Sequence, residues 1–438
     1  MADRLRRREV SSVELVRAAL DTIGRRNPDI QAFVEVDERR ALRTAEEADR
    51  KIARGGDLPL FIGVPTGIKD HEHVRGFGTR AGSKALRWVV SPIDSVLARR
   101  CREGGFILLG KTSTSELTIL PFVDIDLHPP TRNPVARDHY AGGSSGGAAA
   151  AVAAGMIPIA PGSDGAGSIR LPASFCGLVG YKPGRGVLFH EHRTVDPFEI
   201  SAVGPIAKTV RDAAALADVL AGRGMHRDPP HDPSFLSALT RPPRRLRIRF
   251  GIKSPLTLVD PQIEAAVRGT AKKLAALGHH VEEGGAFEGT MEEFLPLMAK
   301  MVRGVPLPPF SDRLLQPTTR WMRAQGRGLS RAGVLESGKH LERRVHASFG
   351  DTDVWLLPTC AHHPPRVGQY EGMSGEDVFR SVVPIGAFTA LFNVSGQPAI
   401  SIPIGRSNGG LPMGAQLVGR RWMDRTVLRL AAELEAAS

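Results

Sequence analysis

Short apolar runs bounded by glycine or proline alternate along the chain with longer stretches whose apolar residues have helical spacing. The runs at residues 61–65, 106–110 and 157–160 are typical of buried strands, and residues 95–102 and 209–220 are typical of helices. Strands that alternate with helices predict an α/β fold around a mostly parallel or mixed β-sheet. The 438 residues, of which 42% are hydrophobic, are enough to bury a large core.

The N-terminal region predicts two helices. Ser11 and Glu14 have the spacing of a capping box, so a helix should begin there. We expect it to end near Gly24, because Asn27-Pro28 should break it. A second amphipathic helix is expected over residues 37–53.

The C-terminal region returns to strands, at residues 354–357, 399–404 and 413–418, before a final helix at 425–436. Late strands commonly return to an early sheet, so we expect one domain over residues 1–438. Its expected parts are N-terminal helices (1–55), a core with the chemical motifs (60–220), a variable, largely helical region (223–350) that opens with a surface connection (223–245), and strands returning to the core (351–438).

The net charge of +12 is compatible with a nucleic-acid or membrane-surface partner. The basic residues, however, are mostly arginines spread along the chain, and no zinc-finger or RNA-recognition motif is present. We therefore expect a solvated basic surface and no nucleic-acid partner. No stretch approaches about eighteen consecutive apolar residues, so no membrane span is expected.

The three cysteines, Cys101, Cys176 and Cys360, lie far apart and form no CxxC pair. Neither a disulfide framework nor a structural zinc site is expected from this spacing. The first residues contain no apolar run of signal-peptide length. Together these features predict a soluble protein of the reducing cytoplasm.

Three short stretches have the residues for chemistry. They are Gly67-Ile68-Lys69-Asp70, Gly142-Gly143-Ser144-Ser145-Gly146-Gly147, and residues 162–172. Each has a simpler interpretation: a solvated lysine, a flexible linker and an ordinary turn. The linker interpretation is weak because the hexapeptide leads directly into an apolar helix. The turn interpretation is weak because residues 165–168 offer consecutive backbone N–H groups, which can form an anion-binding nest.

Hydrolysis of an amide needs a nucleophile, a base, a proton donor for the leaving amine, and donors for the oxyanion. Ser168 is the candidate nucleophile, and the backbone N–H groups of Gly165, Ala166, Gly167 and Ser168 are the candidate oxyanion donors. Lys69 can be the base only if burial lowers its pKa so that it is neutral. Ser144 can relay the proton and then protonate the leaving group.

Taken together, the three stretches resemble the amidase-signature family, which uses a Ser–cis-Ser–Lys triad. In motif order, Lys69 matches the family's lysine, Ser144 its cis serine and Ser168 its nucleophile, while Ser145 matches a serine that helps to hold the lysine. Further stretches resemble the family in the same order: residues 176–183, 204–212, 393–399 and 410–416.

The resemblance implies a large mixed β-sheet covered by helices on both faces. It also implies hydrolysis of a carboxylic amide to acid and ammonia or amine through a Ser168 acyl-enzyme, with no cofactor and no metal. Asp164 and Arg170 are expected to support the site. The expected partner is a small-molecule amide, and a homodimer remains open.

The chain departs from the family at Ala166, where the family usually has glycine. The methyl group is harmless if the φ angle there is negative, which we expect because glycines flank the position on both sides. Residues 117–128 and 284–350 also differ from the sequences that are usual in the family. These segments border the acyl pocket in the family, with Thr118 expected to line it, so the sequence does not predict which amide is the substrate.

Other interpretations differ in class. Residues 142–146 match the G-x-S-x-G elbow of α/β-hydrolases with Ser144 as nucleophile, but residues 134–140 before them make a poor strand. His71-Glu72-His73 and His190-Glu191-His192 suggest metal ligands without completing H-E-x-x-H. The amidase subunit of a tRNA-dependent amidotransferase and a catalytically inactive scaffold remain further alternatives.

Overall fold

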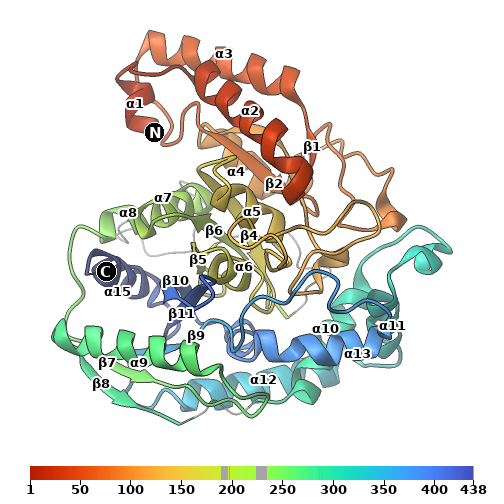
Figure 1. The fold of residues 1–438 in the computed structure, drawn as a ribbon, viewed down its shortest axis with the longest axis vertical. Coiled ribbons are helices and arrows are strands. Elements are labelled where there is room, and N and C mark those ends of the chain that lie inside the picture. The colour runs from red at the N-terminus through yellow and green to blue at the C-terminus, as the bar shows by residue number, and fades with distance from the viewer. Residues whose placement is uncertain (189–195, 197, 223–233, 286, 288, 438) are drawn as a thin grey trace.

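The computed structural model describes residues 1–188, 196, 198–222, 234–285, 287 and 289–437, so His190-Glu191-His192 and residues 223–233 of the expected surface connection lie outside it. A small sheet has the order β1-β3-β2. Its strands are β1 (Phe33–Val36), β2 (Pro65–Lys69) and β3 (Ile107–Thr112). Helices α1 (Ala2–Arg6), α2 (Ser12–Ile30) and α3 (Glu38–Arg54) gather around this sheet at the N-terminal end of the molecule (Figure 1).

A second sheet has eight strands in the order β4-β6-β5-β10-β11-β9-β7-β8. Their bounds are β4 (Ile159–Asp164), β5 (Val179–Lys182), β6 (Ala202–Ala207), β7 (Arg247–Phe250), β8 (His280–Glu283), β9 (Val354–Pro358), β10 (Ala399–Arg406) and β11 (Pro412–Gly419). Strand β7 is parallel to β8 and β9, and the other pairs are antiparallel. The sheet is therefore mixed, and the late strand β10 does return beside the early strand β5.

Apolar clusters cover both faces of the large sheet, as expected. In β9 the side chains of Val354 and Leu356 belong to one buried cluster, and those of Trp355 and Leu357 belong to the other. Successive strand residues point to opposite faces, so the two clusters lie on the two sides of the sheet.

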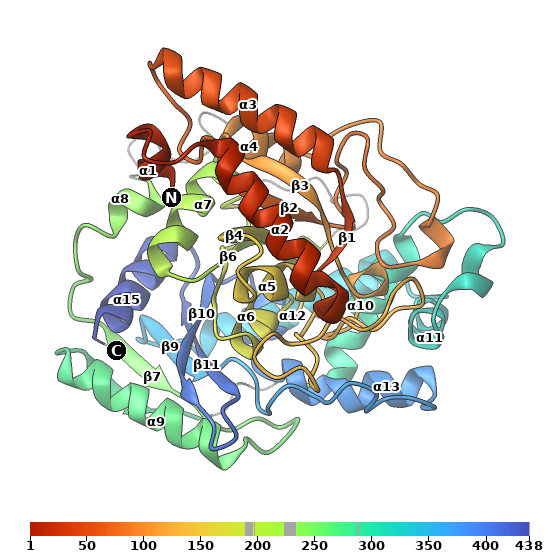
Figure 2. The same ribbon diagram turned by 45° about the horizontal axis from the view of Figure 1, so that its top comes forward.

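Different sets of helices supply these two clusters. Helices α5 (Gly146–Ala153), α7 (Val210–Ala221), α9 (Pro261–Ala276) and α15 (Asp424–Ala436) contribute to the first. Helices α10 (Met291–Gly304), α11 (Pro317–Gln325), α12 (Arg331–Ala347) and α13 (Gly375–Val382) contribute to the second and gather in one part of the molecule (Figure 2). The shorter helices are α4 (Val96–Glu103), α6 (Arg170–Phe175), α8 (Phe235–Ala238) and α14 (Leu391–Val394). No helix among the described residues is both long and apolar enough to cross a bilayer.

Two local predictions were wrong. Helix α2 does not end near Gly24 but continues to Ile30 with Pro28 inside it. A proline so close to the end of a helix removes one hydrogen bond of the last turn, and the Asn27 side chain supports this end by bonding the backbone N–H and C=O of Phe33. The apolar run at residues 61–64 forms turns, and the strand begins only at Pro65.

Candidate active site

Lys69 is the last residue of β2 and is 1% exposed. Its Nζ lies 2.7 Å from Ser144 Oγ and 2.9 Å from Ser163 Oγ. Burial lowers the pKa of Lys69 to about 7, although the negative charges of Glu72 and Asp164 act in the opposite direction. This lysine can therefore exchange a proton near neutral pH.

Ser144 lies in the turn that leads into α5, and the Gly143–Ser144 peptide bond is cis, as the resemblance implies. The turn packs tightly, since a Cβ atom at Gly143 would lie 2.6 Å from the Phe122 backbone nitrogen. Only glycine leaves room for that approach. The buried Ser144 hydroxyl thus meets Lys69 on one side, and Ser144 also lines the main cavity.

Ser145 lies one contact away from Lys69, in keeping with the supporting role that the resemblance implies. Its hydroxyl donates to Ser163 O at 3.1 Å and accepts from Ser163 N at 3.3 Å, and it is the Ser163 hydroxyl that contacts Lys69. Ser145 therefore acts on the lysine through Ser163. Sequence reasoning missed Ser163, whose only signal was its place in the third stretch.

Residues 165–168 connect β4 to α6 and form the turn that we call the oxyanion turn. Gly167 has a φ of 127°, and Ala166 is not among the described non-glycine residues with positive φ, so the expectation for its backbone is confirmed. The Gly167 N–H donates to Asp164 Oδ1 at 2.6 Å, which directs it away from an oxyanion and corrects its predicted role.

The other predicted donors of this turn remain open to a ligand. Across the part of the chain that the structure describes, the N–H groups of Gly165, Ala166 and Ser168 meet no hydrogen-bond partner. All three residues line the cavity that also contains Ser144. Their N–H groups are therefore the candidate oxyanion donors.

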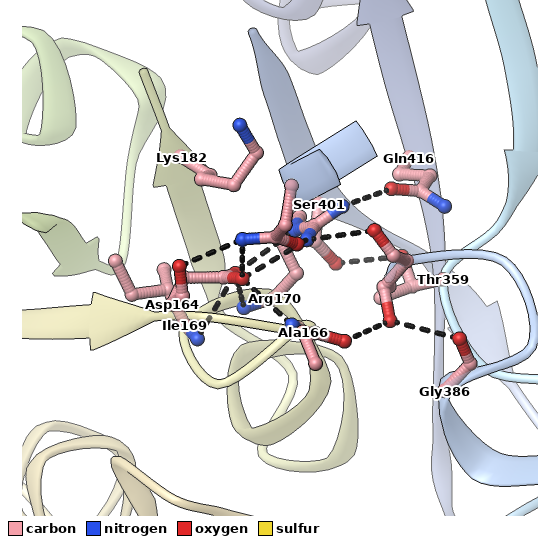
Figure 3. Close-up of polar contacts among 12 residues, drawn as sticks. Asp164, Ala166, Ile169, Arg170, Lys182, Thr359, Gly386, Ser401 and Gln416 are labelled. Atoms are coloured by element: carbon pink, nitrogen blue, oxygen red, sulfur yellow. Dashed lines mark hydrogen bonds and ion pairs between the residues drawn. The ribbon is translucent and has the colours of Figure 1, made fainter. Parts of the chain in front are cut away.

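Asp164 and Arg170 form a fully buried ion pair that supports the oxyanion turn (Figure 3). Arg170 Nε and Nη2 donate to the two carboxylate oxygens of Asp164, at 2.9 and 3.0 Å. Burial acts to raise the pKa of Asp164, but the charge and hydrogen bonds of Arg170 outweigh it and keep that pKa well below its usual range. The carboxylate is thus ionised and can accept the Gly167 N–H.

The C-terminal elements reach the same ion pair. Arg170 Nη1 donates to Gln416 Oε1 at 3.0 Å, and Arg170 Nη2 donates to Asn393 Oδ1 at 2.6 Å. Asn393 Nδ2 in turn donates to Asp164 O at 2.7 Å. Residues more than 200 positions apart in the sequence therefore hold the turn that carries Ser168, which is why the late strands are needed at this site.

A cavity of about 460 Å³ opens beside the serines. Ser144, Ser163, Ser168 and the predicted Thr118 line it. Its wall is mostly apolar and comes from the segments around α10 and α13, with Met291, Phe294, Met298, Met301, Phe379 and Val382 among the lining residues. This volume lies in the range of small-molecule sites.

The histidine pair near Lys69 also reaches the cavity. His71 Nε2 lies 3.3 Å from Glu72 Oε1, and His73 Nδ1 lies 3.1 Å from Ser91 Oγ. Because Ser91 Oγ donates its proton to Ile93 O at 2.8 Å, His73 Nδ1 must carry the hydrogen of that contact. These contacts give both histidines protein partners.

The α/β-hydrolase interpretation fails on local structure. An elbow needs a strand directly before the serine. Residues 134–138 instead form turns, bends and irregular backbone, and His139 and Tyr140 make only isolated bridges, to Arg366 and Arg132.

Comparison with known proteins agrees with the geometry. The Amidase family matches residues 14–428. A putative amidase from Synechocystis sp. is 34% identical over 452 residues, covering 99% of this chain and 87% of that protein. The structure of 6-aminohexanoate cyclic dimer hydrolase with substrate matches at TM-score 0.90 and 30% identity, over 100% of this chain and 95% of that one. A bacterial aryl acylamidase of the amidase signature family matches at TM-score 0.89 and 27% identity, with the same coverage.

The chain therefore belongs to the amidase signature family. Its activity is the hydrolysis of amides, at carbon–nitrogen bonds other than peptide bonds.

Proposed function

We propose that this amidase works through an acyl-enzyme on Ser168. Neutral Lys69 takes the proton of Ser144 while Ser144 takes that of Ser168, and Ser168 Oγ bonds to the amide carbon. The carbonyl oxygen becomes an oxyanion, which the N–H groups of the oxyanion turn stabilise. When the carbon–nitrogen bond breaks, Ser144 protonates the departing nitrogen and recovers a proton from Lys69.

The second half returns the enzyme to its starting state. A water molecule gives a proton to the same Ser144–Lys69 relay and bonds to the acyl carbon. The bond to Ser168 breaks, Ser168 Oγ recovers its proton, and the acid leaves. Atoms and protons balance over the cycle: one amide and one water give one acid and one amine.

The observation that supports this mechanism most directly is the position of Lys69. Its Nζ is buried, lies 2.7 Å from Ser144 Oγ, and has a pKa lowered to about 7 by burial. A charged lysine could not accept the proton, and a solvated one would remain charged at neutral pH.

We propose an apolar acyl or aryl group for the substrate. The described wall of the cavity is mostly aliphatic, aromatic and methionine side chains. Asp196 is the one carboxylate among the described lining residues, and it accepts the backbone N–H groups of Ile200 and Ser201. An anionic acyl group would lose its water without gaining a cation here.

A panel of amides tests both proposals. We expect release of ammonia or amine from apolar aliphatic and aromatic amides, with kcat/KM roughly tenfold or more above that of monoamides with a free carboxylate. After the protein has reacted with a fluorophosphonate, mass spectrometry should locate the adduct on Ser168. An adduct on Ser144, or a preference for anionic amides, would contradict the respective proposal.

We also propose that the chain acts alone or as a homodimer in the cytoplasm. Cys101, Cys176 and Cys360 are buried free thiols, which suits a reducing compartment. Gel filtration of the active protein should give a monomer or dimer. Activity that appears only with added partner chains would favour the amidotransferase subunit instead.

A further inference from the structure

The peptide unit between Ala166 and Gly167 is held at both ends. Its N–H, on Gly167, donates to Asp164 Oδ1 at 2.6 Å. Its C=O, on Ala166, accepts a hydrogen bond from Thr389 Oγ1, also at 2.6 Å. Asp164 belongs to the end of β4, whereas Thr389 comes from the chain between the 3₁₀ turn η5 (Val383–Gly386) and α14.

These two contacts define one orientation of the peptide unit. If the unit turned over, the Ala166 carbonyl would face the ionised Asp164 carboxylate, which repels it, and the Gly167 N–H would face the Thr389 hydroxyl. The fully buried Thr389 hydroxyl would then exchange its 2.6 Å bond to Ala166 O for the longer contact with Gly386 O, at 3.2 Å. The Thr389 hydroxyl therefore favours the observed orientation.

The glycine at 167 is part of the same arrangement. Its φ of 127° lies in the region that favours glycine, and a Cβ there would lie 2.5 Å from Thr389 Oγ1. The absence of a side chain lets the threonine hydroxyl reach the Ala166 carbonyl. Figure 3 shows this carbonyl directed toward the segment that carries Gly386.

The orientation of this unit also determines where the neighbouring Ser168 lies. The next peptide unit carries the N–H of Ser168, and Ser168 carries the reacting hydroxyl. A rotation of the Ala166–Gly167 unit would move both. A displacement of such groups by about 1 Å is enough to slow catalysis strongly.

We propose that Thr389 is a positioning residue, whose hydroxyl holds the Ala166–Gly167 peptide unit and so aims the Ser168 N–H and Oγ at the substrate. This inference rests on the proposed role of Ser168. Thr389 itself does not line the cavity, but its neighbours Gly386, Ala387, Ala390 and Leu391 do. An acyl group that packs against these neighbours therefore also restricts the movement of Thr389, which holds the oxyanion turn.

The test compares Thr389→Val, which keeps the shape and removes the hydroxyl, with Thr389→Ser, which keeps the hydroxyl. We expect the valine variant to lose on the order of tenfold to a hundredfold in kcat, somewhat below the effect of removing an oxyanion donor. KM should change less than about twofold, and the serine variant should stay near wild type. The pH at which activity rises should not move, because Lys69 keeps its contacts.

A matched control is Thr359→Val. Thr359 is also fully buried, but its Oγ1 lies 2.8 Å from Ser401 Oγ on β10 instead of bonding the oxyanion turn. We expect this variant to lower Tm as the valine variant at 389 does, without the loss of kcat. If Thr389→Val does not fold, Thr389→Ala removes the same hydroxyl without placing a methyl group against the carbonyl.

The outcomes separate the two proposals. A wild-type kcat in a folded Thr389 variant without the hydroxyl, while the fluorophosphonate still labels Ser168, overturns the inference and leaves the proposed function intact. An equal loss of kcat in Thr359→Val also overturns it, because the effect would then be general loosening of the core. A fully active Ser168→Ala variant would overturn the proposed function and this inference with it.

Discussion

At the scale of single residues, the proposed mechanism requires that the protonation state of Lys69 decides when the enzyme is active. Its pKa lies near 7 because the side chain is buried, against an ordinary value of 10.5. We predict that kcat/KM rises about tenfold per pH unit below this value and levels off above it. Activity that stays level from pH 5 to 9 would contradict a lysine base.

Substitution of the same residue gives a second view of its role. Lys69→Ala should lower kcat by a factor on the order of 10² to 10⁴. Lys69→Arg is the control for charge and size: it should be as inactive, because a guanidinium remains protonated at any working pH. An active arginine variant would mean that position 69 supplies charge and does not accept a proton.

Two adjacent residues of the oxyanion turn should respond unequally to a change in side-chain size. Ala166 does not have a positive φ, so Ala166→Gly should only add freedom to the unfolded chain, lowering the free energy of unfolding by about 0.4–1 kcal/mol with little effect on kcat. Gly167→Ala should cost about 1–3 kcal/mol and most of the activity, because of its positive φ and the contact with Thr389. Urea unfolding and steady-state kinetics of both variants check this. A more stable Ala166→Gly protein would show that the backbone at 166 is strained.

At the scale of elements, the Asp164–Arg170 pair joins the end of β4 to α6 and the C-terminal strands. Arg170→Met would leave a buried, unpaired carboxylate, which should lower the free energy of unfolding by about 3–5 kcal/mol at pH 8. The same substitution at Arg268, whose partners Glu264 and Glu283 are solvent-exposed, should cost less than about 1 kcal/mol.

The pH dependence of this loss has a definite sign. With Arg170 present, the pKa of Asp164 is lowered, so the ion pair stabilises the protein above the unfolded pKa, and this contribution fades only as the pH falls through the folded value. Without Arg170, burial is opposed by the charge of Lys182 and the hydrogen bond from Asn393, and we expect it to raise the pKa of Asp164 above the unfolded value, so that the folded protein favours the protonated acid. The decrease in the free energy of unfolding caused by Arg170→Met should therefore be smaller at pH 5 than at pH 8. An equal loss at both values would mean that packing, not charge, sets the cost.

The elements also show how far the sequence could be used to predict the structure. The capping box at Ser11 and the triad motifs are local patterns, so the helix start and the residues around the lysine were predictable from them. The continuation of α2 past Pro28 depends on a side-chain contact of Asn27 with Phe33, which no propensity describes.

The parts of the site that escaped prediction depend on long-range contacts. Ser163 holds Lys69 because β4 lies next to it, and Thr389 reaches the oxyanion turn from 223 positions along the chain. A single threonine between an apolar run and Asn393 has no sequence signal for that role. The prediction that the Gly167 N–H is an oxyanion donor failed for a related reason. The sequence shows a row of N–H groups, but it does not show which of them donates to a neighbouring carboxylate.

At the scale of the whole molecule, the strand order favours our prediction that the chain folds as one domain. Strands β10, β11 and β9, from the last ninety residues, lie between β5 and β7 in the middle of the large sheet. Asn393 and Gln416 from the same region bond Asp164 and Arg170 beside Ser168. The active-site half and the C-terminal half therefore share both a sheet and a buried polar network, and neither can be completed alone.

We therefore predict that the two halves unfold together in urea. Trp355 in β9 is 3% exposed and reports on the C-terminal strands, once the other three tryptophans, Trp88, Trp321 and Trp422, are replaced by phenylalanine. Loss of fluorophosphonate labelling at Ser168 reports on the other half. One domain requires the two midpoints to coincide, because the sheet cannot lose β9 to β11 and still support the oxyanion turn. If labelling were lost at a clearly lower urea concentration than the tryptophan signal, the chain would contain two units that unfold separately.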